Sequence, residues 1–151
     1  MKFVIEGEPL SKMRHRHFIR NGHSQTYDPQ KKEKEYVKYL LLRQLRGYLN
    51  GEDLEIAKEA SNLTKECAFS VNLWFYMPIR ESATNSNRTK MRWGLECHTK
   101  KPDLDNLEKF YLDCGNGILF PDDRFITSVV KRKRYSDKPR TEIIVRPQEK
   151  V

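Results

Sequence analysis

The sequence predicts a single α+β domain with a mixed sheet of about five strands and two principal helices. The chain has 151 residues, a length that fits one hydrophobic core, because most domains have about 100 to 200 residues. Two stretches show the apolar spacing of amphipathic helices, and several shorter stretches show the alternation or the turn chemistry of strands. We therefore expect one domain over residues 1–151.

The amino-terminal part is expected to form a strand, a basic loop, a hairpin and a long helix. The strand covers residues 2–6, and the dipeptide Asn21-Gly22 is a strong signal for the tight turn of a hairpin. Apolar residues then recur at helical spacing over 29–46, after Asp28-Pro29, which has the residue types that begin a helix. Residues 50–66 lack strong periodicity and predict a linker or a weak second helix.

The middle of the chain predicts one central strand and one long loop. Residues 67–77 alternate strictly, so that one face of a strand is apolar: Cys67, Phe69, Val71, Leu73, Phe75 and Met77. Residues 80–100 show neither helical nor strand periodicity and carry more basic than acidic side chains. We expect a mobile basic loop there.

The carboxyl-terminal part predicts a second principal helix and two strands. The helix begins with Asp105 as N-cap and Glu108 at the capping-box position, and it should stop at 115–117. A basic strand follows over 126–135, in which Lys131 and Lys133 would face one way and Arg132 and Arg134 the other. A last strand covers 141–146.

The charge balance favours a polyanionic partner. Lys and Arg number 29 against 21 Asp and Glu, which gives a formal net charge of +8. A surface of this sign attracts nucleic acid. The basic residues Lys12, Arg14 and Arg16 lie together beside the first strand and are candidate phosphate contacts, the alternative being a solvated basic loop.

The cysteines and the hydropathy exclude several classes of protein. The three cysteines are widely spaced and form no Cys-x-x-Cys pair, which argues against a disulfide scaffold or a zinc ribbon and favours a reducing cytoplasm. No run approaches the roughly 20 apolar residues of a membrane-spanning helix, and the first residues lack the apolar stretch of a secretory signal. We expect no membrane partner.

A dense acidic cluster interrupts this basic chain. It lies between Lys101 and Arg124 and consists of Asp103, Asp105, Asp113, Asp122 and Asp123. Crowded carboxylates raise one another's pKa unless a cation intervenes, and a hard divalent ion such as Mg²⁺ prefers carboxylate oxygens and water. The cluster therefore indicates a metal site.

A nuclease can be assembled from this cluster. Asp103 and Asp105 flank a helix start, where free N–H groups and the helix dipole favour anions, and the Asp122-Asp123 turn can fold back beside them. Lys109 lies one turn further along the helix and can reach a scissile phosphate. Two metal ions held in this way hydrolyse phosphodiesters. Taken singly, the same residues are also explained as a cap, a turn and a surface ion pair.

The order of these residues resembles the signature of the RusA family of Holliday-junction resolvases. The strings are KPDLDNLEK, followed by LDCGNGILFPDDRFI, and the amino-terminal GEPLSKMRHR and TYDP resemble the family's opening. The resemblance implies a RusA-like fold in which Asp103, Asp105 and Asp123 bind the catalytic Mg²⁺, with Mn²⁺ as an alternative ion, and in which Lys109 is the essential basic residue. It further implies a homodimer that cuts opposing strands of a four-way junction symmetrically, and a bacterial, phage or prophage origin.

The sequence thus predicts a Mg²⁺-dependent, structure-selective endodeoxyribonuclease acting on branched DNA. Two alternatives stay open. The first is a non-catalytic protein that binds branched DNA, with its aspartates serving only as caps and turns. The second is a nuclease that acts on other branched DNA.

Overall fold

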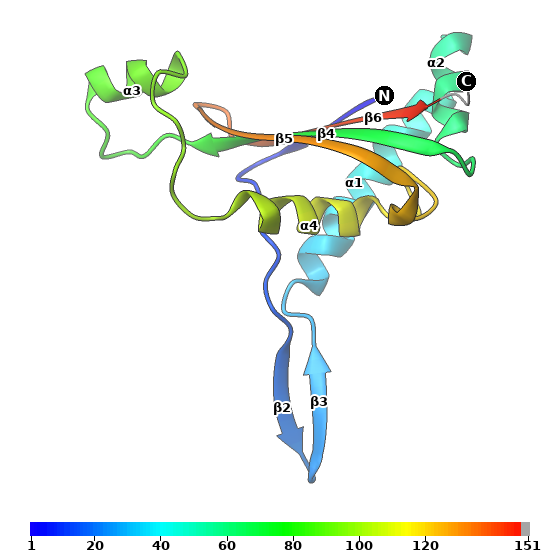
Figure 1. Ribbon diagram of the computed structural model, residues 1–151, viewed down its shortest axis with the longest axis horizontal. Coiled ribbons are helices and arrows are strands. Elements are labelled where there is room, and N and C mark those ends of the chain that lie inside the picture. The colour runs from blue at the N-terminus through cyan, green and yellow to red at the C-terminus, as the bar shows by residue number, and fades with distance from the viewer. Residues whose placement is uncertain (149–151) are drawn as a thin grey trace.

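A computed structural model describes residues 1–148, and a four-stranded mixed sheet forms its centre (Figure 1). The strand order is β1 (Lys2–Glu6), β6 (Arg140–Gln148), β4 (Ala68–Pro78) and β5 (Ile126–Ser136). β4 pairs with β5 in parallel, and the two remaining pairings are antiparallel. The predicted class, a single α+β domain with a mixed sheet, is confirmed.

The apolar face of β4 forms the middle of the core. Its inward residues are each at most 1% exposed: Phe69, Val71, Leu73, Phe75 and Met77. The predicted alternation is therefore the burial pattern of the strand. Each such side chain stabilises the fold by about 1.5–3 kcal/mol relative to an exposed position.

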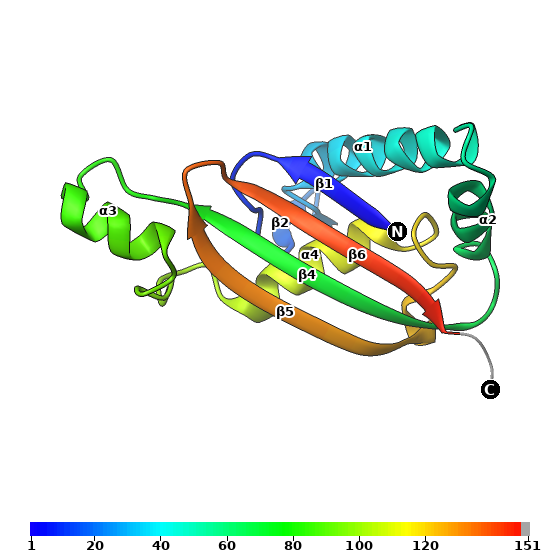
Figure 2. The same cartoon turned by 90° about the horizontal axis from the view of Figure 1, so that it is seen from above.

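Helices α1 (Lys31–Leu49) and α4 (Leu104–Gly115) cover this face of the sheet (Figure 2). α1 runs past Gly47, where the sequence predicted its end. The added turn is held by Tyr48, whose ring packs edge-on against Phe3 at 5.7 Å and whose hydroxyl donates to the Lys2 carbonyl. Of the two outcomes predicted for 50–66, the structure shows the helix, α2 (Leu54–Asn62). Within residues 1–148, no helix combines the length and apolarity needed to cross a membrane.

The predicted hairpin forms a separate ribbon of β2 (Arg16–Arg20) and β3 (His23–Tyr27). Asn21 and Gly22 both have positive φ, 52° and 76°, as a tight two-residue hairpin turn requires. The ribbon projects away from the sheet on the side of α4 (Figure 1). The sheet itself consequently has four strands.

The expectation of a loop over 80–100 is wrong for α3 (Asn85–Arg92). The Thr84 hydroxyl caps this helix by accepting from the Asn87 amide at 3.3 Å. Met91, 2% exposed, is its single buried residue, so the helix is too short and too polar to show a periodic apolar stripe. Arg92 ties it to the β5–β6 connection through Asp137, with Nε 2.6 Å from a carboxylate oxygen.

Candidate active site

Two exposed carboxylates stand at the beginning of α4. Asp103, rather than Asp105, is the N-cap residue, and its side chain makes no capping hydrogen bond. Asp105 lies in the first turn. The predicted capping box is wrong, because Glu108 does not return to the helix start but forms an ion pair with Lys131 of β5. Neither carboxylate therefore makes a hydrogen bond that caps the helix.

Lys109 lies one turn beyond Asp105 and pairs with it. The Lys109 ammonium donates to the Asp105 carboxylate at 2.7 Å, and both side chains are more than half exposed. This hydrogen bond lowers the pKa of Asp105 and raises the pKa of Lys109. The pair consequently presents one ionised carboxylate and one protonated amine to solvent, side by side.

The alternation predicted for β5 places two lysines under the start of α4. Lys131 and Lys133 are partly buried, whereas Arg132 and Arg134 are exposed. The Lys133 ammonium donates to the carbonyls of Lys100 and Pro102, at 2.7 and 2.8 Å. Burial lowers the pKa of Lys133, and the nearby Asp103 opposes that shift. Lys133 thus fixes the segment that leads into Asp103.

Asp113 does not join the group around Lys109. It lies further along α4, and its carboxylate is 2.7 Å from the Lys12 ammonium and 3.7 Å from that of Lys34. Lys34 also pairs with Asp28 at 2.7 Å, which lowers the pKa of that carboxyl. Asp113 therefore belongs to a second charged cluster, between α4, α1 and the root of the hairpin.

Asp122 and Asp123 lie at the opposite end of α4. Asp122 caps the short 3-10 helix η1 (Asp123–Phe125) by accepting from the Arg124 amide at 3.0 Å, and Asp123 is exposed. Because Lys131 and Lys133 mark the start of α4 along β5, the distance from η1 to that start is roughly 16 Å or more at 3.3 Å per strand residue. Figure 2 shows η1 and the start of α4 at opposite ends of the helix. Within one chain, this turn does not fold back beside the helix start, as the sequence predicted it would.

The acids of one chain can hold a metal ion only in part. Within residues 1–148, no three Asp, Glu, His or Cys side chains lie close enough to hold an ion. Mg²⁺, however, is commonly bound through one or two protein carboxylates, with water and a substrate phosphate as its other ligands. Asp103 and Asp105 fit that open arrangement, since both are exposed.

Of the basic residues Lys12, Arg14 and Arg16, the first two lie beside this site, between β1 and the hairpin, and Arg16 is the first residue of β2. The Lys12 amide donates to the Asn106 carbonyl of α4 at 2.8 Å. A shallow groove runs there, lined by residues of both segments: Lys12, Met13, Arg14, His15, His17, Asn106 and Lys109. Sequence reasoning did not find this junction with α4, because a backbone contact to Asn106 leaves no mark on residue type or spacing.

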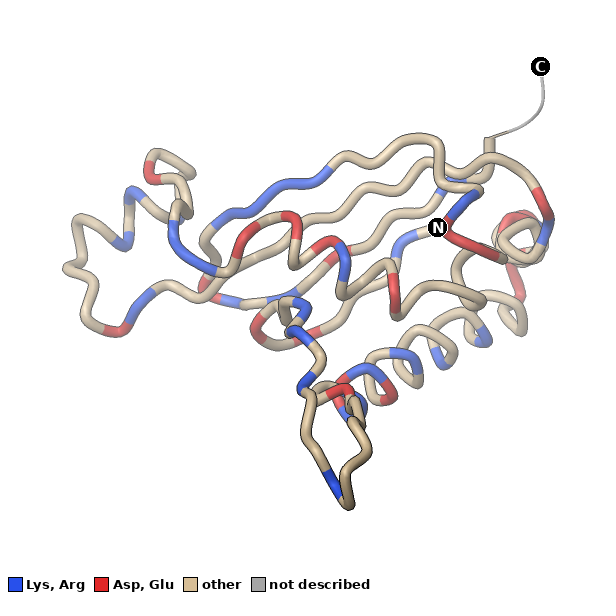
Figure 3. The backbone as a smooth tube through the Cα atoms, turned by 60° about the horizontal axis from the view of Figure 1, so that its bottom comes forward, with Lys and Arg blue, Asp and Glu red and all other residues tan. Residues whose placement is uncertain are grey.

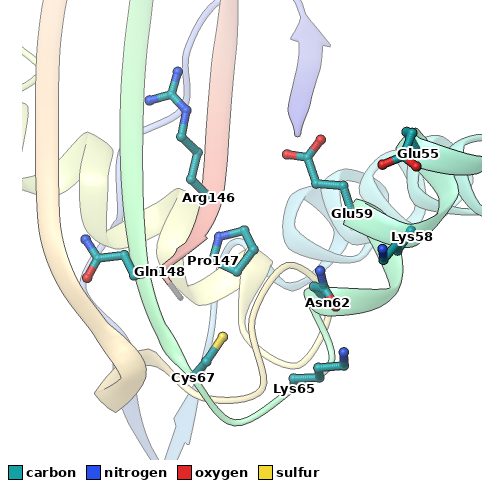
Figure 4. A pocket seen from close by; sticks show the side chains of 9 residues that line it. All are labelled: Glu55, Lys58, Glu59, Asn62, Lys65, Cys67, Arg146, Pro147 and Gln148. Atoms are coloured by element: carbon teal, nitrogen blue, oxygen red, sulfur yellow. The ribbon is translucent and has the colours of Figure 1, made fainter. Parts of the chain in front are cut away.

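A second hollow lies at the other end of the molecule. Figure 4 shows its lining, which comes from α2 and from the adjoining ends of β4 and β6: Glu55, Lys58, Glu59, Asn62, Lys65, Cys67, Arg146, Pro147 and Gln148. Both acidic and basic side chains line it, and none of the predicted site residues contributes. It is therefore separate from the start of α4.

The chain resembles known proteins along nearly its whole length. The family model for endodeoxyribonuclease RusA matches residues 6–146. A protein described as "Uncharacterized protein YqaN", from Bacillus subtilis (strain 168), is 29% identical over 148 residues, which cover 97% of this chain and 95% of that protein. The match includes the start of α4, the η1 turn and the hairpin.

Proposed function

The chain belongs to the RusA endodeoxyribonuclease family, and on this basis we propose that it is a Mg²⁺-dependent endonuclease that resolves four-way DNA junctions by symmetric phosphodiester hydrolysis. One observation of the structure supports the proposal above others. Asp105 and Lys109 form an exposed pair at 2.7 Å, beside the uncommitted carboxylate of Asp103. Such a set suits an anionic substrate that arrives together with a divalent cation.

Asp103 and Asp105 would hold the ion, which supplies positive charge that polarises the scissile phosphate when it is bound. The free N–H groups at the start of α4 and the positive end of the helix dipole attract the same phosphate. Lys109, kept protonated by Asp105, offsets the negative charge that grows on the phosphorus oxygens during attack. Lys133 positions Asp103 through its two carbonyl contacts.

The separation of the acids supports a homodimer. Asp123 lies at the far end of α4 from Asp103 and Asp105 within one chain, yet it is exposed and able to meet a second molecule. We propose that Asp123 of a second copy completes each metal site. Two such sites related by a twofold axis would cut opposing strands of the junction symmetrically.

The basic residues beside the site and the free cysteines indicate how the enzyme meets DNA and in which compartment it acts. Lys12 and Arg14 would contact backbone phosphates beside the cut, because they border the groove that reaches Lys109, and Arg16 would extend this contact from the first residue of β2. The cysteines of the described chain, Cys67, Cys97 and Cys114, are free thiols. We therefore place the activity in the cytoplasm of a bacterium, acting on its own DNA or on that of a phage or prophage.

Cleavage of an end-labelled synthetic four-way junction tests the function, with a linear duplex and other branched DNA as competitors. We expect paired nicks in Mg²⁺ or Mn²⁺ and none in EDTA. Asp105→Asn should abolish the nicks while binding persists or tightens, since a metal ligand and a charge facing phosphate are both lost. The control is Glu52→Gln, which makes the same charge change at an exposed loop residue between α1 and α2 and should cut normally.

Each other outcome identifies an alternative. Binding without cutting in every metal tried would favour a non-catalytic protein that binds branched DNA. Preferential cutting of a fork or flap would favour a nuclease for other branched DNA. Normal cutting by Asp105→Asn would remove Asp105 from the site.

A further inference from the structure

We propose that the β2–β3 hairpin is a DNA-reading ribbon that lies in the major groove of the junction arm next to the cut. The inference rests on the proposed function, because it takes branched DNA as the substrate. It concerns the outer part of the hairpin, from Phe18 to Tyr27, beyond the basic residues already placed beside the groove.

The ribbon is a separate two-stranded sheet, which pairs with no other strand of residues 1–148. All ten residues of its two five-residue strands are exposed. Ile19 near the tip is 79% exposed, and the partly exposed rings of Phe18 and Tyr27 pack edge-on with their centroids 6.0 Å apart. An isolated two-stranded hairpin is marginally stable in water, so a surface that covers it stabilises it.

The charge of the ribbon, together with that of the segment leading into it, favours a polyanion as the partner that covers it. Residues 9–27 contain no Asp or Glu, and they carry four cationic side chains, Lys12, Arg14, Arg16 and Arg20. Figure 3 shows these cations at the root and at the tip of the projecting ribbon. Lys12 pairs with Asp113, whereas the three arginines form no ion pair within residues 1–148 and complement a phosphate backbone.

The register divides the ribbon into two unlike faces. One face, called here the arginine face, carries residues paired across the strands: Arg16 with Tyr27, Phe18 with Gln25, and Arg20 with His23. The opposite face carries His17, Ile19, Ser24 and Thr26 and no Lys or Arg. Arginine reads guanine and glutamine reads adenine through paired hydrogen bonds at base edges. The arginine face is therefore the one that turns to the DNA.

The dimensions fit the major groove. Two paired strands lie about 4.8 Å apart, and their side chains widen the ribbon to about 12 Å. This is the width of the major groove of B-DNA, whereas the minor groove is only about 6 Å wide. Five residues extend about 17 Å, which is half of a helical turn of B-DNA or about five base pairs. The ribbon can therefore read a short stretch of one arm.

The root of the ribbon fixes its position relative to the cut. Gln30, which follows β3, binds the segment that leads into β2. Its side chain accepts from the Met13 amide at 2.6 Å and donates to the Ser11 carbonyl at 2.8 Å. The Lys12 amide is bound to the Asn106 carbonyl, one residue after Asp105. The segment before β2 is thus bound to the start of α4, and Gln30 holds the segment after β3 to it. The ribbon therefore extends from the scissile phosphate into the flanking arm.

A pair of neighbouring substitutions tests the proposal. Gln25→Glu and Ser24→Glu each add one negative charge at an exposed position of β3, but on opposite faces of the ribbon. We expect Gln25→Glu to weaken junction binding about tenfold at moderate salt and Ser24→Glu to change it less than twofold. Dimethyl sulfate should show guanine N7 protected over about five base pairs of one arm flank, with protection lost only in Gln25→Glu.

Equal effects of the two substitutions, or no N7 protection with the wild-type protein, would overturn the proposal. A change in oligomeric state of Gln25→Glu without DNA would also overturn it, because the ribbon would then contact a second copy of the chain. Cleavage at saturating protein separates this inference from the proposed function. Gln25→Glu should still cut under these conditions. If the wild type cuts no DNA at all, the proposed nuclease function is rejected, and the dimethyl sulfate footprint alone then tests the contact with the major groove.

Discussion

The smallest unit of the proposed site is the ion pair of Asp105 and Lys109. Lys109 donates to Asp105 at 2.7 Å, and this contact holds the pKa of Asp105 below its ordinary value. The carboxylate therefore stays ionised to lower pH than a free aspartate. What the pair adds to stability is present above the ordinary pKa and is lost as the pH falls through the lowered one. Because both side chains are exposed, the consequence concerns charge at the site more than folding.

Substituting Lys109 by alanine is expected to separate chemistry from folding. Cleavage should be lost, while circular dichroism and the melting temperature should stay those of the wild type, because the side chain is 55% exposed. The pKa of Asp105, followed through its carboxyl resonance by NMR without metal, should be higher than in the wild type, because the Lys109 ammonium that lowers it is absent. A titration midpoint that did not move would show that the ion pair does not form in solution.

Sequence reasoning succeeded with individual residues wherever a local rule governs them. The Asn21-Gly22 turn and the opposite facing of Lys131 and Arg132 follow from backbone conformation and strand geometry alone. The N-cap was misplaced by two residues, from Asp103 to Asp105. Both are aspartates at a helix start, so residue type does not distinguish them.

At the scale of elements, the contact between β5 and the segment before α4 holds the site in place. Lys133 donates to two carbonyls there, and Lys131 pairs with Glu108. The position of these side chains therefore depends on how β5 packs against α4, to which residues 116–125 connect it.

Substituting Lys133 by methionine is expected to loosen that contact. The Lys100 and Pro102 carbonyls lose their donor, so urea unfolding should show a loss of about 1–2 kcal/mol, and cleavage should fall as Asp103 loses its support. Arg132→Met is the control, because Arg132 lies on the other face of β5, 5.3 Å from the Trp74 ring. Equal loss of cleavage in both variants would contradict a special role for Lys133.

The root of the hairpin is expected to set the salt dependence of binding. Each phosphate neutralised contributes about −0.9 to the slope of log K against log salt. Replacing Lys12, Arg14 and Arg16 together by alanine should therefore make the slope shallower by about two to three, measured on a junction between roughly 50 and 200 mM salt. An unchanged slope would remove these residues from the phosphate contacts.

Elements were predictable to the extent that they carry periodic apolar residues. β4 and α4 bury continuous apolar stripes, so the sequence predicts them, whereas α3 buries Met91 alone and carries no periodic pattern that would predict a helix. The position of Asp123 was beyond such rules. It depends on α4 running antiparallel to β5, a tertiary arrangement that no single segment encodes.

At the scale of the whole molecule, the separation of Asp123 from Asp103 and Asp105 is the main constraint on the proposed mechanism. One chain offers two carboxylates at one end of α4 and the third at the other end, and none of the described residues forms a closed metal cage. A twofold dimer resolves the separation if the third carboxylate comes from the second copy. Each active site would then exist only in the assembly, so that cleavage and dimerisation would be linked.

Mixing two inactive variants distinguishes shared sites from sites within one chain. If Asp105→Asn and Asp123→Asn subunits exchange freely, half of the dimers are mixed, and in each of these one shared site has all its acids intact. About a quarter of all sites then regain activity, whereas sites built within one chain regain none. A supercoiled plasmid with a cruciform should consequently be nicked by the mixture rather than linearised, because only one strand of each junction is cut. Each variant alone should leave the plasmid intact, and an inactive mixture of demonstrably exchanged subunits would place all three aspartates in one chain's site.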